Sequence, residues 1–279
     1  MNVAQQILRG ASRLGEAFSP KATASLAARL FFSPRRLPAK VALTRSPKEE
    51  GPLPVGYFRR WSDGAPIYLL HGWEGSYHQF GSLVASLESR GFGAITLDPP
   101  AHGKAQGKQA NLRGFADTLL SAQETLGIPF GAIGHSLGGL ALMLALRDGL
   151  AARGAILISS PAGSGLPIRQ FEDLLGLGER TRAELRSIIA ARVQEDHESM
   201  HAGGLLKAKR PQGLIVHDDD DRKIPASHAG EILSAWPEAS IMRTKGYGHN
   251  RVLNAAVAEK IGDWWRKFAK DFDAGRTWI

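Results

Sequence analysis

The sequence predicts an α/β fold in which a doubly wound, mostly parallel sheet carries helices on both of its faces. Apolar runs of strand length alternate with amphipathic stretches of helix length, which is typical of such sheets. Glycine is frequent, with 32 among 279 residues, as expected where many strands turn tightly into helices. Histidine, serine and aspartate stand where several apolar runs end, and parallel sheets bind ligands beyond the carboxyl ends of their strands.

The amino-acid composition limits the number of domains and the kinds of site that the chain can form. Hydrophobic residues make up 43% and charged residues 22%, which suffices for one core without a second domain. Cysteine is absent, which excludes disulfides, a thiol nucleophile and a thiolate metal site and fits a reducing compartment, so we expect a cytoplasmic protein. The longest apolar runs, such as 137–146, are shorter than the roughly 18 residues of a membrane span.

Residues 1–50 differ from the rest of the chain and form a basic arm. Up to residue 48 the arm holds nine Lys or Arg and a single acid, Glu16, within a chain of net charge +8. Apolar residues such as Ile7, Leu14 and Phe18 recur close to a helical period. We weigh three interpretations: a helical arm packed on the core, a basic amphipathic helix in peripheral contact with a membrane, and a targeting sequence. No nucleic-acid-binding motif accompanies the charge, so we do not expect nucleic acid as a partner.

Residues 51–279 supply the alternating elements, and each element is expected from its own pattern. Mainly apolar runs bounded by turn residues predict strands, at 55–61, 66–70, 93–97, 128–133, 154–158, 213–217 and 239–243. The run 66–70 is continuously apolar, as buried strands of parallel sheets are. Helical periodicity predicts the helices that connect them, at 76–90, 112–126, 137–146, 225–236 and 251–270. Residues 162–210 interrupt this order, because they contain no strand pattern and show helical stretches at 171–175, 180–192 and 194–201.

The most informative stretch is Gly134-His135-Ser136-Leu137-Gly138-Gly139, between the strand at 128–133 and the following helix. A serine in the pattern G-x-S-x-G sits on a sharp turn, where small neighbours let strand and helix approach closely. The turn exposes the hydroxyl of Ser136 at the carboxyl edge of the sheet. It also leaves the backbone N–H of Leu137 at a helix N-terminus, where it can stabilise an oxyanion.

This stretch resembles the nucleophile elbow of the serine α/β-hydrolase family. Four further segments resemble elements of that family in the same order, across residues 52–270: His71-Gly72-Trp73, the loop 98–103, the run 217–225 and the loop 245–250. The resemblance implies an α/β-hydrolase fold with a small helical cap inserted at about 162–210. The alternative for 162–210 is a decorated crossover between two strands.

The resemblance also implies the roles of the site residues. Ser136 is the expected nucleophile, His249 the general base and Asp221 the acid that orients the base. Four consecutive aspartates occupy 218–221, and composition alone does not choose among them; the spacing to Pro225 resembles the acid loop of the family and favours Asp221, with Asp219 and Asp220 as alternatives. The backbone N–H groups of Trp73 and Leu137 are the expected oxyanion-hole donors.

We expect neither a metal nor another cofactor. His197 and His201 have a spacing of four, but the segment lacks the glutamate and the third ligand of a zinc site. The aspartate run lacks the glycine turn of a Ca²⁺ loop. His71, His102 and His135 are expected to be structural.

The function that we infer is hydrolysis of small carboxylic esters by a serine hydrolase through an acyl-enzyme. The same machinery serves thioesterases and acyltransferases, which stay open as alternatives. An alternative of another class is a non-catalytic module that binds a membrane surface or a partner through the basic arm. The oligomeric state and the acyl chain length are left open.

Overall fold

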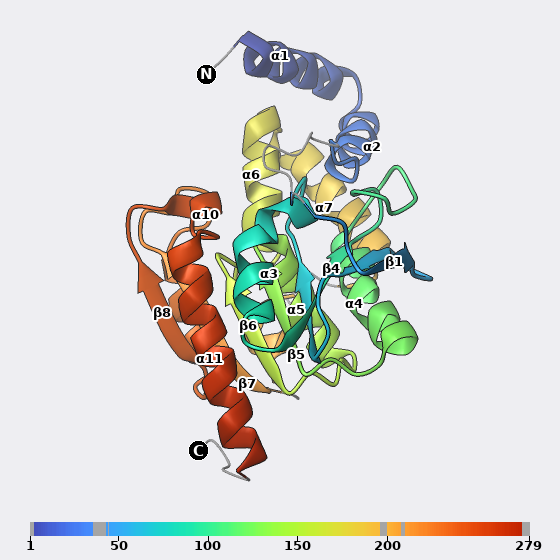
Figure 1. Ribbon diagram of the computed structural model, residues 1–279. Coiled ribbons are helices and arrows are strands. Elements are labelled where there is room, and N and C mark those ends of the chain that lie inside the picture. The colour runs from blue at the N-terminus through green and yellow to red at the C-terminus, as the bar shows by residue number, and fades with distance from the viewer. Residues whose placement is uncertain (1–2, 36–42, 44, 196–199, 208–209, 275–279) are drawn as a thin grey trace.

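An eight-stranded sheet forms the centre of the molecule (Figure 1). The computed structural model describes residues 3–35, 43, 45–195, 200–207 and 210–274. The order of the strands is β1-β2-β4-β3-β5-β6-β7-β8. Their bounds are β1 Glu49–Pro52, β2 Tyr57–Arg60, β3 Ala65–Leu70, β4 Phe92–Asp98, β5 Gly131–His135, β6 Gly154–Ile158, β7 Gln212–Asp218 and β8 Ser240–Thr244.

The sheet is mostly parallel, as predicted. Strands β3 to β8 are parallel to one another. At one edge, β1 and β2 form an antiparallel hairpin, and β2 also pairs antiparallel with β4. Strands β4, β5 and β6 are buried along their whole length, which is why their sequences are continuously apolar or small rather than alternating. The carboxyl ends of β3, β4, β5 and β7 therefore meet at one edge, where the candidate residues lie.

Helices cover both faces of the sheet (Figure 1). The short η1 (Tyr77–Phe80), α3 (Gly81–Glu88) and α11 (Ala255–Asp273) pack on one face together with Trp61 and Trp265. On the other face lie α4 (Leu112–Leu126), α5 (Leu137–Arg147) and α9 (Ser227–Ala235). Asparagine side chains cap two of these helices, Asn111 at α4 and Asn254 at α11, and each satisfies a backbone N–H that the helix leaves without a partner.

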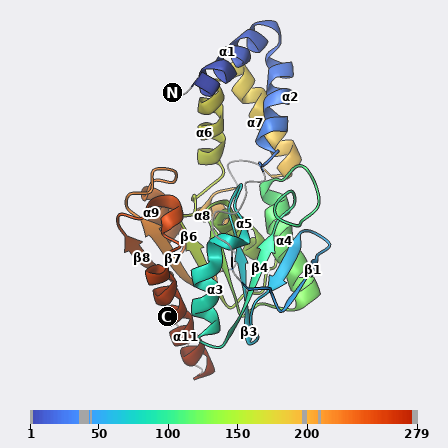
Figure 2. The same ribbon diagram turned by 45° about the horizontal axis from the view of Figure 1, so that its top comes forward.

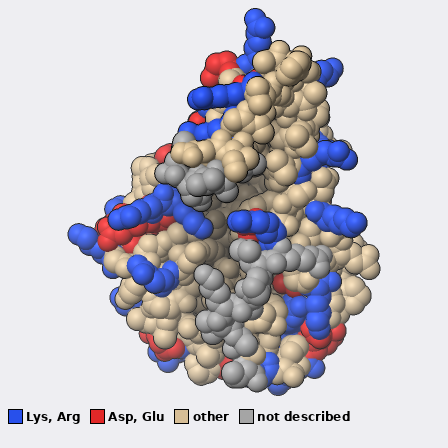
Figure 3. Space-filling view, turned by 90° about the horizontal axis from the view of Figure 1, so that it is seen from above, with Lys and Arg blue, Asp and Glu red and all other residues tan. Residues whose placement is uncertain are grey.

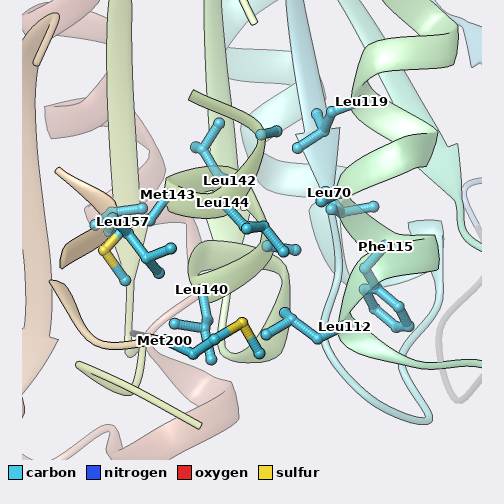
Figure 4. Close-up of a cluster of buried hydrophobic side chains, with 14 of the residues drawn as sticks. Leu70, Leu112, Phe115, Leu119, Leu140, Leu142, Met143, Leu144, Leu157 and Met200 are labelled. Carbon is cyan, nitrogen blue, oxygen red and sulfur yellow. The ribbon is translucent and has the colours of Figure 1, made fainter. Parts of the chain in front are cut away.

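Leucines predominate in the core between α4, α5 and the sheet, together with Phe115, Met143 and smaller alanines (Figure 4). Leu140, Leu142 and Leu144 of α5 are fully buried, as is Phe115 of α4. Met200, which follows α7 within the inserted segment 162–210, joins this cluster. Helix α5 is therefore held from every side, and its first turn, which follows Ser136, is fixed in place.

Four helices form a lobe above the carboxyl edge of the sheet (Figure 2). Helices α1 (Val3–Phe18) and α2 (Pro20–Phe31) come from the N-terminal arm, and α6 (Gly165–Leu175) and α7 (Glu179–Val193) come from the insertion. Helix α2 packs against α7 and α1 against α6. We call these four helices the lobe. None of the described helices is both long and apolar enough to cross a membrane.

Two details of the lobe follow from local sequence. The buried alanines Ala24, Ala27 and Ala28 let α2 approach α7 closely. The prediction of a helix at 194–201 is wrong for the residues that the structure describes there, 194–195 and 200–201. Gln194 takes a left-handed conformation that ends α7, and the next helix is the short α8 (Ala202–Leu205).

Candidate active site

Ser136 occupies a strained turn between β5 and α5. Its backbone has φ 55° and ψ −123°, and a non-glycine residue at positive φ is held there only by its surroundings. The N–H of Ser136 donates to the carbonyl of Ile158 on the neighbouring strand at 2.9 Å. A Cβ at Gly138 would lie 2.3 Å from the carbonyl oxygen of Leu70, so only glycine allows α5 to start so close to β3. The turn leaves the hydroxyl at the carboxyl edge of the sheet.

His249 lies between Ser136 and Asp221. It belongs to the short helix α10 (Gly248–Arg251), which follows β8. Its Nε2 is 3.1 Å from the Oγ of Ser136, and its Nδ1 is 2.8 Å from Oδ2 of Asp221. With Nδ1–H donating to the carboxylate, Nε2 is left to accept the hydroxyl proton of Ser136. A hydroxyl, an imidazole and a carboxylate in this order can perform nucleophilic catalysis.

Asp221 is buried, and its second oxygen is also satisfied. Oδ1 accepts the backbone N–H groups of Lys223 at 2.9 Å and Ile224 at 3.0 Å. Burial alone would raise the pKa of this carboxyl, but the hydrogen bonds from His249, Ile224 and Lys223 outweigh burial and lower the pKa to about 2. Asp221 is therefore ionised at neutral pH, and its carboxylate accepts the hydrogen bond from Nδ1 of His249.

The other three aspartates of the run have separate partners. Asp218 accepts the N–H groups of Tyr247 and Gly248 and the hydroxyl of Thr244, so it holds the loop that carries His249. The exposed Asp219 pairs with Arg243, and Asp220 accepts the N–H of Gly246. Of the four, Asp221 is the one that hydrogen-bonds to the imidazole of His249.

The loop after β3 lies directly beside Ser136. A Cβ at Gly72 would be 2.8 Å from the Cβ of Ser136. In the described part of the chain, neither the N–H of Trp73 nor that of Leu137 has a protein acceptor, and both belong to segments in contact with Ser136. Both N–H groups are therefore placed to donate to the oxyanion of a carbonyl group whose carbon is bonded to Oγ of Ser136.

Two side chains support the loop that carries Trp73. The N–H of Glu74 donates to Nε2 of His102 at 3.1 Å, and Nδ1–H of His102 donates to the carbonyl of Pro100 at 2.9 Å. Burial, with some repulsion from His71, lowers the pKa of His102 to about 4, so its ring is neutral. The guanidinium of Arg35, just after α2, makes two hydrogen bonds of 2.9 Å to the carboxylate of Glu74.

His135 contributes more to the site than the sequence indicated. Its Nε2 donates to the carbonyl oxygen of His249 at 3.0 Å, and its Nδ1 accepts from the side-chain amide of Gln79 at 3.0 Å. Burial lowers the pKa of His135 to about 3, with a further contribution from His249. Gln79 was not singled out in the sequence, because a glutamine in a helical stretch carries no motif.

The acid loop and the His249 loop also border an open cleft of about 960 Å³, which residues 219–223 and 246–251 line. Within the described ranges, no three His, Asp or Glu side chains gather as a metal site requires. Of the two histidines with metal-like spacing, His197 lies outside the described residues, and His201 forms an isolated β-bridge with Gly163.

Known proteins similar to this chain share its fold. A sequence profile described as “Alpha/beta hydrolase family” matches residues 67–260. The structure is similar to an alpha/beta hydrolase enzyme, MGS-MChE2, from a lagoon-sediment metagenome, with a TM-score of 0.60 and 17% identity over 81% of this chain and 100% of the other. A thermophilic esterase from Thermogutta terrifontis gives 0.60 and 17%, over 78% and 98% of the two chains. A Paleococcus ferrophilus monoacylglycerol lipase gives 0.59 and 19%, over 76% and 97%.

One curated protein matches at the level of sequence. It is named “Magnesium-chelatase 30 kDa subunit” of Rhodobacter capsulatus and is 37% identical over 90 residues. The match spans 30% of this chain and 31% of that protein.

Proposed function

The chain belongs to the alpha/beta hydrolase family, and from this premise we propose that it is a serine hydrolase that cleaves carboxylic esters. The observation that carries the proposal is the unbroken contact from Asp221 through His249 to the hydroxyl of Ser136. The esterase and lipase named among the similar structures support an ester as the substrate.

In the proposed reaction, Oγ of Ser136 attacks the carbonyl carbon of the ester while Nε2 of His249 takes the hydroxyl proton. Asp221 stabilises the imidazolium that forms. The N–H groups of Trp73 and Leu137 bind the oxyanion of the tetrahedral intermediate. His249 then gives its proton to the leaving alkoxide, and the acyl group stays on Ser136.

The second half of the reaction repeats these steps with water. His249 takes a proton from a water molecule, the resulting hydroxide attacks the acyl-enzyme, and the proton returns to Oγ as the carboxylic acid leaves. A thiol leaving group or an alcohol in place of water would use the same residues, so thioester hydrolysis and acyl transfer are the alternatives that the test distinguishes.

The test is fluorophosphonate labelling of the purified protein, followed by turnover of p-nitrophenyl esters from acetate to palmitate. We expect Ser136→Ala to abolish labelling and to lower kcat by about 10⁶-fold, as removal of a nucleophilic serine does. The matched control is Ser234→Ala, which removes an exposed hydroxyl on α9 and leaves both unchanged. Acyl-CoA substrates and an alcohol acceptor, assayed in parallel, identify a thioesterase or an acyltransferase.

Two outcomes contradict the proposal. Labelling that persists in Ser136→Ala places the nucleophile elsewhere. A folded wild-type protein that neither labels nor turns over any of these substrates favours the non-catalytic binding module.

A further inference from the structure

Helix α1 exposes its apolar side to solvent and packs its polar side against the rest of the lobe, which is the reverse of the usual arrangement in a globular protein. An amphipathic surface helix normally buries its apolar stripe and exposes its polar side. Here Ile7, Leu14 and Phe18 share one side of α1 and are exposed, with 66%, 68% and 89% of their surfaces accessible. Arg9 and Glu16, on the opposite side, contact the rest of the lobe.

The polar side of α1 is bound to the turn between α6 and α7. Arg9 donates to the carbonyl oxygens of Asp173 at 2.5 Å and Leu174 at 3.3 Å, at the end of α6. Glu16 accepts the N–H of Gly178 at 2.7 Å, at the start of α7. The helix dipole stabilises a cation at a helix C-terminus and an anion at a helix N-terminus, so both contacts are favourable. These contacts fix the orientation of α1, and the apolar stripe therefore faces outward because of specific bonds.

The exposed apolar surface of the molecule is concentrated on the lobe. Of eight large hydrophobic side chains that are exposed in the described residues, six lie on α1, α2 and α6: Ile7, Leu14, Phe18, Leu26, Leu30 and Leu174. In Figure 2, α1 lies across the outer end of the lobe, farthest from the sheet. A patch of this kind marks a surface that binds something apolar.

Cationic side chains outnumber acidic ones on α1 and α2, which carry most of this surface. Residues 3–35 contain five Lys or Arg and one acid. That acid, Glu16, accepts the N–H of Gly178 at the start of α7. Arg13, Lys21 and Arg29 are exposed. Figure 3 shows uncharged side chains over much of the lobe, with Lys and Arg at its edges and a smaller number of Asp or Glu side chains among them.

We propose that the outer face of α1 and α2 is a docking surface for an anionic lipid bilayer. Ile7, Leu14 and Phe18 enter the acyl region, and Arg13, Lys21 and Arg29 contact the anionic headgroups. A helix with a narrow apolar stripe, low overall hydrophobicity and flanking cations lies in the plane of a bilayer interface. In the proposed orientation the lobe lies between the membrane and the carboxyl edge of the sheet.

The charge pattern favours a bilayer over a second copy of the chain. A two-fold dimer brings the same patch together with itself, so the cationic rims around the two stripes would oppose each other. In an anionic bilayer, the headgroups complement the cations beside the stripe, and the acyl region complements the apolar stripe itself. The docking surface does not depend on the proposed esterase activity, because it involves neither Ser136 nor His249.

The test is co-sedimentation of the full chain with vesicles of phosphatidylcholine, with or without phosphatidylglycerol. Ser136→Ala protein serves as well as wild type, so loss of catalysis does not affect the measurement. We expect binding to the anionic vesicles that weakens as salt is added. We expect Ile7→Ser/Leu14→Ser/Phe18→Ser to lower the partition coefficient by at least about tenfold. Its control, Ile128→Ser, alters a residue of 62% exposure on the body and leaves binding unchanged.

A second pair of variants tests the charges. Arg13→Gln/Lys21→Gln/Arg29→Gln is expected to weaken binding to anionic vesicles by about fivefold for each charge removed. Lys245→Gln/Lys260→Gln/Lys270→Gln removes the same charge from exposed positions on the body and is expected to bind as wild type does. Circular dichroism verifies that every variant is folded.

Three outcomes overturn the proposal. The first is that wild-type protein does not bind anionic vesicles. The second is that the serine triple variant binds them as well as wild type does. The third is a lipid-free dimer in sedimentation equilibrium that the serine triple variant converts to a monomer, since the stripe is then the interface between two copies.

Discussion

His135 donates a hydrogen bond from Nε2 to the main-chain carbonyl of His249, over a distance of 3.0 Å. His135 precedes Ser136 in the chain, so this bond connects the elbow to the loop of its partner imidazole. Gln79 fixes the ring from the other side by donating to Nδ1. Because the pKa of His135 is lowered to about 3, the ring stays neutral and keeps this one arrangement of donor and acceptor at neutral pH.

The first prediction concerns this bond. His135→Phe keeps a ring but removes the donor, and we expect kcat for a p-nitrophenyl ester to fall about tenfold, because a small misplacement of His249 suffices for such a loss. KM should change little, since His135 does not face the substrate side. His135→Gln, whose amide can donate to the same carbonyl, should recover part of the rate. Equal rates for the Phe variant and wild type would show that the bond has no positioning role.

The second prediction separates two buried aspartates. Asp221→Asn leaves the loop in place but removes the charge that His249 needs, so we expect kcat to fall by about 10³–10⁴-fold with a nearly unchanged unfolding midpoint. Asp218→Asn loses the carboxylate that accepts several backbone donors, and we expect it to lower the free energy of unfolding by about 2 kcal/mol.

Denaturant unfolding and ester turnover, measured on both variants, distinguish the two roles. Asp220→Asn is the control, since this exposed carboxylate accepts the N–H of Gly246 and does not contact His249. A larger loss of kcat in Asp218→Asn than in Asp221→Asn would contradict the assignment.

The sequence predicted which segments of the site meet, but not the contacts that hold them. Ser136, Asp221 and His249 each stand in a local motif, and the parallel sheet brings the ends of their strands to one edge. The bond from His135 to His249 joins residues 114 positions apart, and the amide of Gln79 has no motif. Such contacts depend on the exact packing of loops, which periodicity does not encode.

The fold was predicted best where apolar runs are long. Strand β6 and helix α4 have the expected bounds, because burial on both faces of a sheet and clear helical periodicity leave strong patterns. Strand β1 was missed, since Glu49-Glu50-Gly51-Pro52 has no apolar side and is a strand only through its pairing with β2. A helical arm packed on the core was one of three interpretations of residues 1–50. The contact of α1 and α2 with α6 and α7 was not predicted, because it depends on polar bonds such as that of Arg9.

The third prediction uses the narrow space at Gly72. In Gly72→Ala, the new Cβ would meet the side chain of Ser136 at 2.8 Å and the carbonyl of His135 at 3.1 Å. The loop that carries Trp73 must then move, and we expect kcat to fall about 10²-fold. Gly230→Ala, where the new Cβ meets nothing within 4 Å, is the matched control. It lies inside α9 and should raise the free energy of unfolding by about 0.5–1 kcal/mol without changing kcat. An unchanged rate for Gly72→Ala would show that this loop does not take part.

The fourth prediction concerns the bond between the arm and the loop of Trp73. Arg35→Ala removes the two side-chain hydrogen bonds to Glu74 and keeps the one from the backbone N–H, at 3.1 Å. The Arg35 side chain is 76% exposed, so we expect kcat to fall by no more than about fivefold, with KM unchanged. Arg45→Ala removes a similar exposed pair, with Glu88 on α3, and should not affect kcat. Identical rates for the two variants would show that the arm does not position this loop.

The last prediction is a loss of stability in mild acid, caused by two buried histidines. His102 and His135 have pKa values of about 4 and about 3 in the folded protein, below the ordinary 6.5, because burial disfavours their charged forms. The unfolded chain therefore binds more protons than the folded protein between pH 6.5 and 4. Their stabilising contribution is complete above pH 6.5 and declines as the pH falls, by up to about 1.4 kcal/mol per pH unit for each histidine.

Urea unfolding at pH 7, 6, 5 and 4 measures this slope. Asp221 contributes little to this slope, because its pKa is lowered to about 2 in the folded protein; its stabilising contribution is complete above pH 4 and is lost as the pH falls through 2. The carboxylates are the same in the wild type and in a histidine variant, so the difference between the two slopes reports on the histidine. His135→Gln removes one of the two groups and should reduce the slope between pH 6 and 4 by up to about 1.4 kcal/mol per pH unit, whatever its stability at pH 7. If the variant and the wild type have the same slope, His135 already carries a proton in the folded protein, and its hydrogen bond from Gln79 must be reassigned.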